Sequence, residues 1–285
     1  MRAFAYARPT TIAEALALLD EHGPEARLLC GGTDLVVGLR KGTIRPRLVI
    51  DLKRVAELRP EIVDTGSALV FGASGVLTDL IEDARVQRHF PALVEAALVV
   101  GSVQIRNRAT LAGNICNASP AADTAPALLV YGARVNLAGV DGRRSVAYDD
   151  FVMGPRQTLL RRGELVASIE LPLPSEPLGA AFARLTRRRG VDLATISLCC
   201  SVSRSGVTRF AYGAVGPRPF LVTDASGVLA DPAAGEPARE EILARFIAQA
   251  SPISDVRASR EYRHAMLAVL SRRALRTAID RLAAQ

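Results

Sequence analysis

Several residue types that mark particular classes of protein are scarce in this 285-residue sequence. There is no tryptophan and aromatic residues make up 5% of the chain, so a platform for stacking nucleobases is poorly supplied. The four cysteines form no CxxC pair and the three histidines lie far apart, which argues against a metal or iron–sulfur site built by this chain alone. No apolar run reaches the roughly 18 residues that a membrane-spanning helix needs.

Lysine is also rare, because Lys41 and Lys53 are the only two, and arginine supplies most of the positive charge behind the net charge of +7. This charge is spread along the chain, which fits anionic ligands or an acidic protein partner and does not point specifically to nucleic acid. The first nine residues lack the apolar core of a signal peptide. We therefore expect a cytoplasmic protein, which would be exported only with a partner that carries its own signal.

An early segment combines the end of an apolar strand, two adjacent glycines and the start of a helix. Its residues are Leu28, Leu29, Cys30, Gly31, Gly32, Thr33, Asp34 and Leu35. Adjacent glycines allow a sharp turn with uncovered N–H groups, and Thr or Asp before an apolar run is a helix N-cap signal. This geometry receives a phosphate, because free N–H groups and the helix dipole favour an anion. An ordinary turn without a ligand is the alternative for this segment taken alone.

The hydrophobic pattern predicts an α+β fold with a two-part N-terminal region and a C-terminal domain. Residues 1 to about 55 are predicted as a small βαβ-like unit, and residues 56–175 as a larger unit with a mixed or antiparallel sheet. The expected strands of these units are 27–30, 47–51, 68–73, 133–137, 144–146 and 164–171, and the expected helices begin at 12, 35, 78 and 91. Prolines between 172 and 177 mark the boundary to a C-terminal α+β domain, residues 176–285. Strands at 192–202 and 207–215 and helices at 237–250 and 259–282 are expected there.

A polar, glycine-bearing segment between Gly101 and Thr124 shows no clear periodicity. We expect a long loop here, and such loops inside compact domains are uncommon unless they bind something. An irregular surface connection is the alternative interpretation.

Five segments resemble, in the same order over nearly the whole chain, the FAD-binding medium subunit of the molybdenum hydroxylase family, which includes xanthine dehydrogenase and aerobic carbon monoxide dehydrogenase. The segments are 30–35, 106–127, 150–158, 184–194 and 255–266. The second and the last are the most specific. The resemblance implies a two-part FAD-binding region, residues 1–175, followed by a C-terminal domain of the carbon monoxide dehydrogenase flavoprotein type. FAD would lie extended between them, with its flavin edge toward partner subunits.

The resemblance also implies which residues contact FAD. The backbone of 28–35 would hold the pyrophosphate, while Thr110, Gly113 and Asn114 would hold the phosphates and ribityl chain from the other side. Asp123 would bind a ribose or ribityl hydroxyl. The remaining implied contacts are Ser119, Leu165, which would line the flavin, and Arg184, which stands where the family has a lysine near the ring. Ala112 replaces a glycine of the family, which a loop tolerates if that residue keeps a negative φ.

The implied activity is electron output by an oxidoreductase subunit in which no residue of this chain need act as acid, base or nucleophile. Molybdopterin on a large partner and 2Fe–2S clusters on a small partner would deliver electrons to this chain's FAD, in a dimer of heterotrimers. NAD⁺, a quinone or O₂ would accept them. Arg184 and Arg188 could stabilise a negatively charged reduced flavin or steer an anionic acceptor. Asp192 would neighbour the flavin or pair with the arginines. A self-sufficient flavoprotein oxidoreductase is the alternative, and an RNA-binding module that uses Arg187–Arg189 is a third hypothesis.

Overall fold

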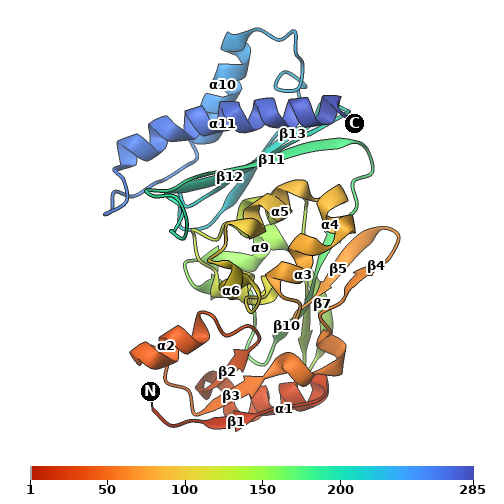
Figure 1. Ribbon diagram of the computed structural model, residues 1–285, viewed down its shortest axis with the longest axis vertical. Helices are drawn as coiled ribbons and strands as arrows, with labels where there is room; N and C mark the ends of the chain where they lie inside the picture. The colour runs from red at the N-terminus through yellow and green to blue at the C-terminus, as the bar shows by residue number, and fades with distance from the viewer. Residues whose placement is uncertain (1) are drawn as a thin grey trace.

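The computed structural model describes residues 2–285, which form three units along the long axis of the molecule (Figure 1). The N-terminal unit is a parallel three-stranded sheet in the order β1–β3–β2, with two helices. Its elements are β1 (Ala5–Ala7), α1 (Ile12–His22), β2 (Ala26–Leu29), α2 (Leu35–Lys41) and β3 (Leu48–Asp51), with short 3-10 turns at Gly23–Glu25, Leu52–Arg54 and Ala56–Leu58. The predicted βαβ-like unit is confirmed. Strand β1 was not predicted, because three residues are too few to show an alternating pattern.

The helix α1 begins at residue 12, as predicted, and follows a capping box. The Thr11 hydroxyl accepts the N–H of Glu14 at 3.2 Å, and the Glu14 carboxylate accepts the N–H of Thr10 at 2.7 Å. The reciprocal bond of the capping box is therefore made to the residue before the cap. Gly23 ends the helix with a φ of +50°, a conformation that glycine adopts without strain.

The middle unit is built on an antiparallel five-stranded sheet in the order β4–β5–β10–β6–β7. Its strands are β4 (Ile62–Asp64), β5 (Ala68–Gly72), β6 (Arg134–Gly139), β7 (Gly142–Ala147) and β10 (Leu165–Pro172), and β8 (Val152–Gly154) pairs separately with β9 (Gln157–Thr158). Its helices are α3 (Leu77–Glu82), α4 (Ala84–His89), α5 (Pro91–Leu98), α6 (Val103–Arg106), α7 (Leu111–Asn117), α8 (Thr124–Val130) and α9 (Tyr148–Phe151). The four strands predicted for this region are confirmed, with ends shifted by a few residues.

The expectation of one long loop from Gly101 to Thr124 is wrong. The segment contains α6 and α7, and α8 begins at its end. Each helix has at most seven residues, so none shows two full turns of apolar periodicity in the sequence. The side chains of Ser102 and Thr110 cap the first two of these helices.

The C-terminal unit is a four-stranded antiparallel sheet in the order β11–β12–β13–β14, with two helices. Its elements are β11 (Leu178–Leu185), β12 (Ile196–Ser203), β13 (Thr208–Gly213), β14 (Phe220–Asp224), α10 (Glu236–Ile247) and α11 (Arg260–Ala283). The sequence predicted β12, β13 and both helices. Strand β12 starts later than predicted, because residues 186–195 form the hairpin loop after β11.

The C-terminal sheet is buried on both faces. Cys199 packs in the core shared with the middle unit, whereas its neighbour Cys200 packs in a second core with α10 and α11. Figure 1 shows α11 along the outer side of this sheet and α5 on the side of the middle unit. Both cysteines are fully buried and act as small apolar residues.

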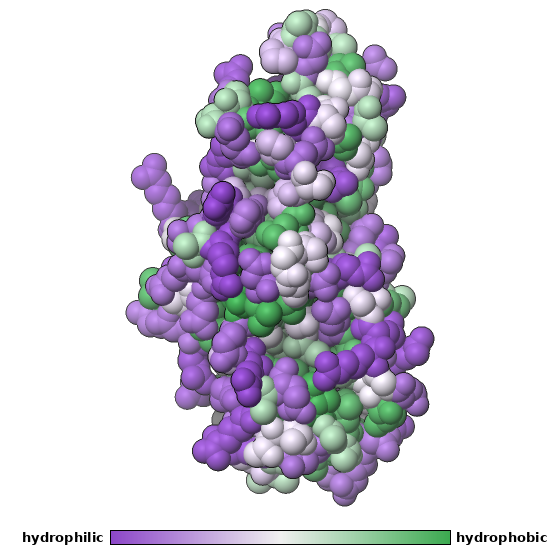
Figure 2. Space-filling view, turned by 90° about the vertical axis from the view of Figure 1, so that its right-hand side faces the viewer, coloured by the Kyte–Doolittle hydropathy of each residue, from purple (hydrophilic) through white to green (hydrophobic). Residues whose placement is uncertain are grey.

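The surface on the right-hand side of Figure 1 is mainly hydrophilic, with apolar residues scattered among the polar ones (Figure 2). In the described residues 2–285, no helix is long and apolar enough to cross a membrane. The same residues hold no group of three or more His, Cys, Asp or Glu side chains placed to bind a metal ion.

Candidate functional site

The glycine turn between β2 and α2 packs directly against the segment that leads into α7. A Cβ atom built on Gly31 would lie 2.1 Å from the carbonyl oxygen of Arg108, so only glycine fits this contact. Gly32 has a φ of +78°, which other residues rarely adopt. The structure therefore brings together the two segments that the resemblance assigns to one cofactor.

The turn presents a run of free backbone donors. Within residues 2–285, the N–H groups of residues 31–35 have no hydrogen-bond acceptor, whereas the next N–H, of Val36, bonds to the Gly32 carbonyl at 2.9 Å. Asp34 occupies the N-cap position of α2, as the sequence indicated, but its side chain makes no capping bond. Free donors at the start of a helix are the arrangement that holds a phosphate.

The helix α7 supplies the facing surface. The Thr110 hydroxyl accepts the N–H of Gly113 at 2.9 Å and fixes the first turn of the helix. Ala112 is buried and keeps a negative φ inside the helix, so its methyl group is accommodated. Gly113 is exposed, and its Cβ position meets only the Thr110 hydroxyl, at 3.0 Å. A ligand can therefore approach this part of the backbone closely.

Asn114 and Asp123 connect α7 to α8 and to the C-terminal unit. The Asn114 side-chain oxygen accepts the Thr124 hydroxyl at 2.7 Å. The buried Asp123 carboxylate accepts the Arg184 guanidinium at 2.8 Å through Oδ2, while its Oδ1 has no partner among the described residues. Burial raises the pKa of Asp123 to about 6, although the charge of Arg184 opposes this. A buried carboxylate oxygen without a partner fits a ligand that donates a hydroxyl proton.

Arg184 is held by three acceptors from two units. Besides Asp123, its guanidinium donates to the carbonyl oxygens of Val99 at 3.0 Å and of Asp192 at 3.2 Å. The Asp192 carboxylate pairs with Arg187 at 3.4 Å, as one of the two sequence interpretations expected. Arg184 therefore fixes the hairpin loop 186–195 beside the start of α8.

Charged residues missed by the sequence analysis lie at the carboxyl end of the N-terminal parallel sheet. Asp51 is the last residue of β3 and pairs in register with Leu29. Its carboxylate accepts hydrogen bonds from the Lys53 ammonium at 2.5 Å and from the Tyr6 hydroxyl. Burial would raise the pKa of Asp51, but these hydrogen bonds lower it overall. Ligands bind at the carboxyl ends of parallel strands, so the position of Asp51 at the end of a predicted strand was the signal available in the sequence.

Two thiols lie at the meeting of the glycine turn and α7. Cys30 precedes Gly31 and is partly exposed, while Cys116 is exposed on α7. Surrounding protein nevertheless raises the pKa of Cys30 to about 11 and that of Cys116 to about 12. Cys116 was not among the predicted contacts.

Two of the predicted FAD contacts, Leu165 and Ser119, are not exposed at this surface. Leu165 begins β10 and is fully buried, so its side chain does not reach solvent in this structure. Ser119 is half-buried, and its hydroxyl accepts the N–H of Ala121 at 3.3 Å.

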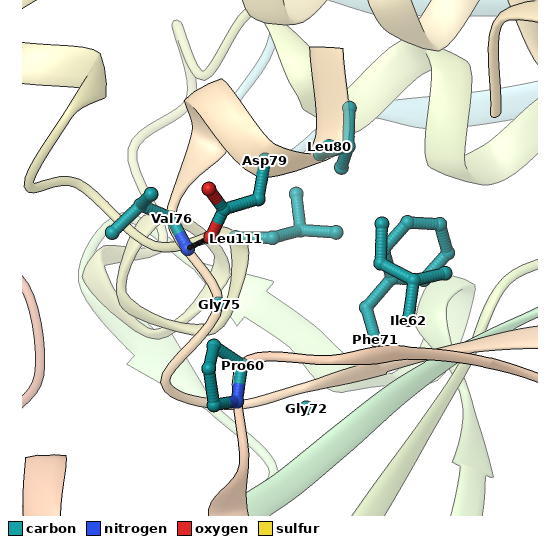
Figure 3. A pocket seen from close by; sticks show the side chains of 9 residues that line it. All are labelled: Pro60, Ile62, Phe71, Gly72, Gly75, Val76, Asp79, Leu80 and Leu111. Carbon is teal, nitrogen blue, oxygen red and sulfur yellow. Dashed lines mark hydrogen bonds between the residues drawn. The ribbon is translucent and has the colours of Figure 1, made fainter. Parts of the chain in front are cut away.

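Two hollows lie outside the glycine turn. A pocket of about 10 Å³, enough for roughly one water, lies between α3 and the sheet, with the Leu111 side chain at its edge (Figure 3). Its single polar contact in the figure is the N–H of Val76, which donates to Asp79 at 3.4 Å. A groove of about 250 Å³ between the middle and C-terminal units is lined by Tyr131, Leu173 and Arg209, among others. Neither includes residues of the glycine turn.

The comparison with protein families covers almost the whole chain. Residues 2–174 match the FAD binding domain in molybdopterin dehydrogenase, and residues 180–278 match the CO dehydrogenase flavoprotein C-terminal domain. These two matches meet at the proline-bearing stretch between β10 and β11.

Two similar proteins match this chain over nearly their whole length. The chain is 32% identical over 279 residues to the xanthine dehydrogenase FAD-binding subunit of Escherichia coli O157:H7, covering 96% of this chain and 95% of that one. It is 34% identical over 284 residues to the carbon monoxide dehydrogenase medium chain of Hydrogenophaga pseudoflava, covering 98% of each.

Solved structures share the fold. The reconstituted CO dehydrogenase from Oligotropha carboxidovorans contains a chain that matches with a TM-score of 0.91 and 31% identity, over 98% of this chain and 99% of that one. Carbon monoxide dehydrogenase from H. pseudoflava that lacks the Mo-pyranopterin moiety matches with a TM-score of 0.89 and 33% identity, over 98% of each chain.

Proposed function

Because the chain belongs to the family of FAD-binding subunits of xanthine and carbon monoxide dehydrogenases, we propose that it transfers electrons through FAD within a larger molybdenum hydroxylase complex. It is an FAD-binding oxidoreductase subunit, and its relatives include medium chains of carbon monoxide dehydrogenase and nicotine 6-hydroxylase. The proposed partners are a small subunit with 2Fe–2S clusters and a large subunit with molybdopterin, assembled as a dimer of heterotrimers. The electrons leave to an external acceptor.

The glycine turn and α7 are the proposed FAD cradle. The free N–H groups of residues 31–35 bind the pyrophosphate, and Thr110, Gly113 and Asn114 face it from the other side. The contact between Gly31 and Arg108 supports this arrangement, because it sets both segments at one surface. When bound, FAD supplies the redox chemistry, and the protein orients it and tunes its potential.

Asp123 and Arg184 have complementary proposed roles. Asp123 accepts a ribose or ribityl hydroxyl through the oxygen that has no protein partner. The guanidinium of Arg184 is engaged by three protein acceptors, so it acts on the cofactor by positioning Asp123 and the hairpin loop. The proposed limits of the two domains are residues 1–175 and 176–285.

Purified chain tests the proposal through its absorption spectrum and its partners. We expect a yellow protein with a flavin spectrum that co-purifies with iron–sulfur and molybdopterin polypeptides when all three are expressed together. A colourless chain that does not bind added FAD would contradict the cofactor assignment. A yellow chain that oxidises a substrate without partners would contradict the assembly and favour the self-sufficient flavoprotein.

A further inference from the structure

The inner face of the C-terminal sheet extends beyond the part that the middle unit covers. Successive residues of a strand point to opposite faces, so Cys199 and Ser201 of β12 share the face toward the middle unit. Cys199 pairs with Ala211 of β13, and both lie in the core that the two units share. The next pair on this face, Ser201 with Arg209, lines the groove between the two units instead. The floor of the groove is therefore the uncovered end of a sheet face.

The walls of the groove come from the middle unit and from the chain that links it to the C-terminal unit. The end of α8 supplies Val130 and Tyr131, and the connection between β10 and β11 supplies Leu173 and Pro174. Figure 1 shows this connection on the right-hand side of the molecule, where it passes from one unit to the other. Apolar walls with a few polar groups are typical of pockets that take a small ligand with an apolar body.

Two polar groups on the floor have hydrogen-bonding capacity left over. Ser201 is 1% exposed, and its hydroxyl makes no hydrogen bond within residues 2–285. Arg209 is exposed, and its guanidinium makes a single long bond, to the carbonyl oxygen of Val130 at 3.4 Å. A guanidinium and a free hydroxyl on neighbouring strands favour a ligand with anionic oxygen atoms.

The carboxylate at the groove is already engaged by protein donors. Glu176 accepts the hydroxyl of Ser205 at 2.7 Å and its N–H at 2.8 Å. These hydrogen bonds lower the pKa of Glu176, so it stays ionised and directed toward the 203–206 turn. Among the residues that line the groove, Arg209 is therefore the charged group without a counter-charge.

We propose that this groove binds a small monocarboxylate with an apolar body, of the size of benzoate. The Arg209 guanidinium and the Ser201 hydroxyl hold the carboxylate, and the ring or short chain lies against the apolar walls. The groove volume of about 250 Å³ equals that of roughly eight waters, at about 30 Å³ each, which is enough for such a molecule. No residue of the glycine turn or of α7 lines the groove, so the inference goes beyond the proposed function and does not depend on it.

The test uses benzoate as the probe and the purified full-length chain, with and without added FAD, with its leucine methyl groups labelled with ¹³C. The methyl signals of Leu173 and Leu178, which line the groove, should shift saturably with benzoate. The signal of Leu267, in the outer core with α11, should not move. A ligand of about nine non-hydrogen atoms should bind with a Kd on the order of 1 mM.

Variants and a neutral analogue assign the recognition to the floor. Arg209→Gln should raise the Kd for benzoate at least about tenfold, and Ser201→Ala should raise it about threefold. Arg273→Gln is the control, because Arg273 is also exposed but lies on α11, and it should match the wild type. Benzamide has the shape of benzoate without the charge, and it should bind the wild type at least about tenfold more weakly.

Several results would overturn the inference. They are the absence of a saturable shift at Leu173 and Leu178, equal affinity for benzamide, full affinity in Arg209→Gln, and competition between benzoate and FAD for one site. The benzamide comparison uses wild-type chain, so it decides the matter even if a variant fails to fold. A chain that binds benzoate in the groove but not FAD contradicts the proposed function alone, and a chain that binds FAD but not benzoate contradicts this inference alone.

Discussion

At the scale of single residues, the proposed contact between Asp123 and FAD makes FAD binding depend on pH. Its raised pKa, about 6, means that the folded chain without FAD holds this proton more tightly than the unfolded chain, whose aspartates titrate near 4. The associated stability is fully present below about pH 4 and is lost as the pH rises through about 6. A cofactor hydroxyl that donates to Oδ1 needs the ionised form of Asp123. FAD therefore binds more tightly above about pH 6 than below it.

We therefore predict that the Kd for FAD rises about tenfold between roughly pH 7.5 and pH 5, the difference between a charged and a neutral acceptor. Asp123→Asn should bind FAD more weakly at neutral pH and show a flat profile over this range. Fluorescence titrations with FAD at several pH values give the Kd of the wild type and of the variant. A variant that retains the pH dependence of the wild type would show that another group titrates.

The sequence predicted which residues belong to this site better than it predicted the contacts between them. Gly31 and Asp123 were proposed as contacts from the sequence, but the contact of Gly31 with Arg108 joins residues distant in the chain and depends on how the units pack. Cys116 was expected in a loop, because a helix of seven residues leaves no clear periodic signal in the sequence. The resemblance supplied the roles of Asn114 and Arg184, which composition and spacing do not reveal.

At the scale of secondary-structure elements, the start of α7 depends on one hydroxyl. Thr110 satisfies the N–H of Gly113, which otherwise has no acceptor in the first turn. Thr110→Ala should lower the free energy of unfolding by about 1 kcal/mol, while Thr110→Ser should retain most of it. Urea denaturation measures the difference. Equal stability of the Ala and Ser variants would contradict the capping role.

The segment before α11 depends on a buried arginine. Arg263 donates to the carbonyl oxygens of Thr195 and Ala214 and to Asp255 at 2.8 Å. Burial would raise the pKa of Asp255, but hydrogen bonds from the Arg257 backbone and from Arg263 bring it down to about 2. The stability that this carboxylate contributes is present above about pH 4 and is lost as the pH falls toward 2.

Asp255→Ala should therefore destabilise the chain at neutral pH by about 3 kcal/mol, because Arg263 stays buried without its charged partner. Between about pH 4 and pH 2, the stability gap between variant and wild type should narrow as the wild-type carboxylate takes up its proton. Chemical denaturation at each pH gives the difference in the free energy of unfolding between the variant and the wild type. A gap that stays constant across this range would mean that the ion pair does not carry the effect.

The elements themselves were predicted well where they are long. The helices α1 and α11 and the strand β10 show full periods of apolar residues, and all three appeared near their predicted positions. The short elements β1, α6 and α7 were not predicted. Their formation depends on pairing and capping partners, and their own sequences are too short to show periodicity.

At the scale of the whole molecule, the C-terminal domain is not independent of the rest. One face of its sheet packs on the middle unit through residues such as Cys199, and Glu95 of α5 accepts the N–H of Phe182 at 3.0 Å and the guanidinium of Arg281. Two domains follow from the family matches, yet one of the two cores is shared.

A fragment of residues 176–285 should therefore be insoluble when it is expressed alone, because the shared face of its sheet becomes exposed. Co-expression with residues 1–175 should bring both fragments into the soluble fraction as a complex. Size-exclusion chromatography of the co-expressed pair checks this. A soluble, cooperatively folded fragment 176–285 would show that its outer core with α10 and α11 suffices.

The most direct test of the account is a FAD titration of the purified chain and of Gly31→Ala, with Gly235→Ala as the control. The added methyl group at Gly31 meets the Arg108 carbonyl and must separate the two walls of the cradle, whereas the nearest atom at Gly235 is 3.7 Å away. We predict one FAD per wild-type chain and an affinity loss of roughly thirtyfold, or about 2 kcal/mol, for Gly31→Ala. Gly235→Ala should match the wild type. A Gly31→Ala variant that folds and binds FAD as tightly as the control would contradict the claim that the two segments form one FAD site.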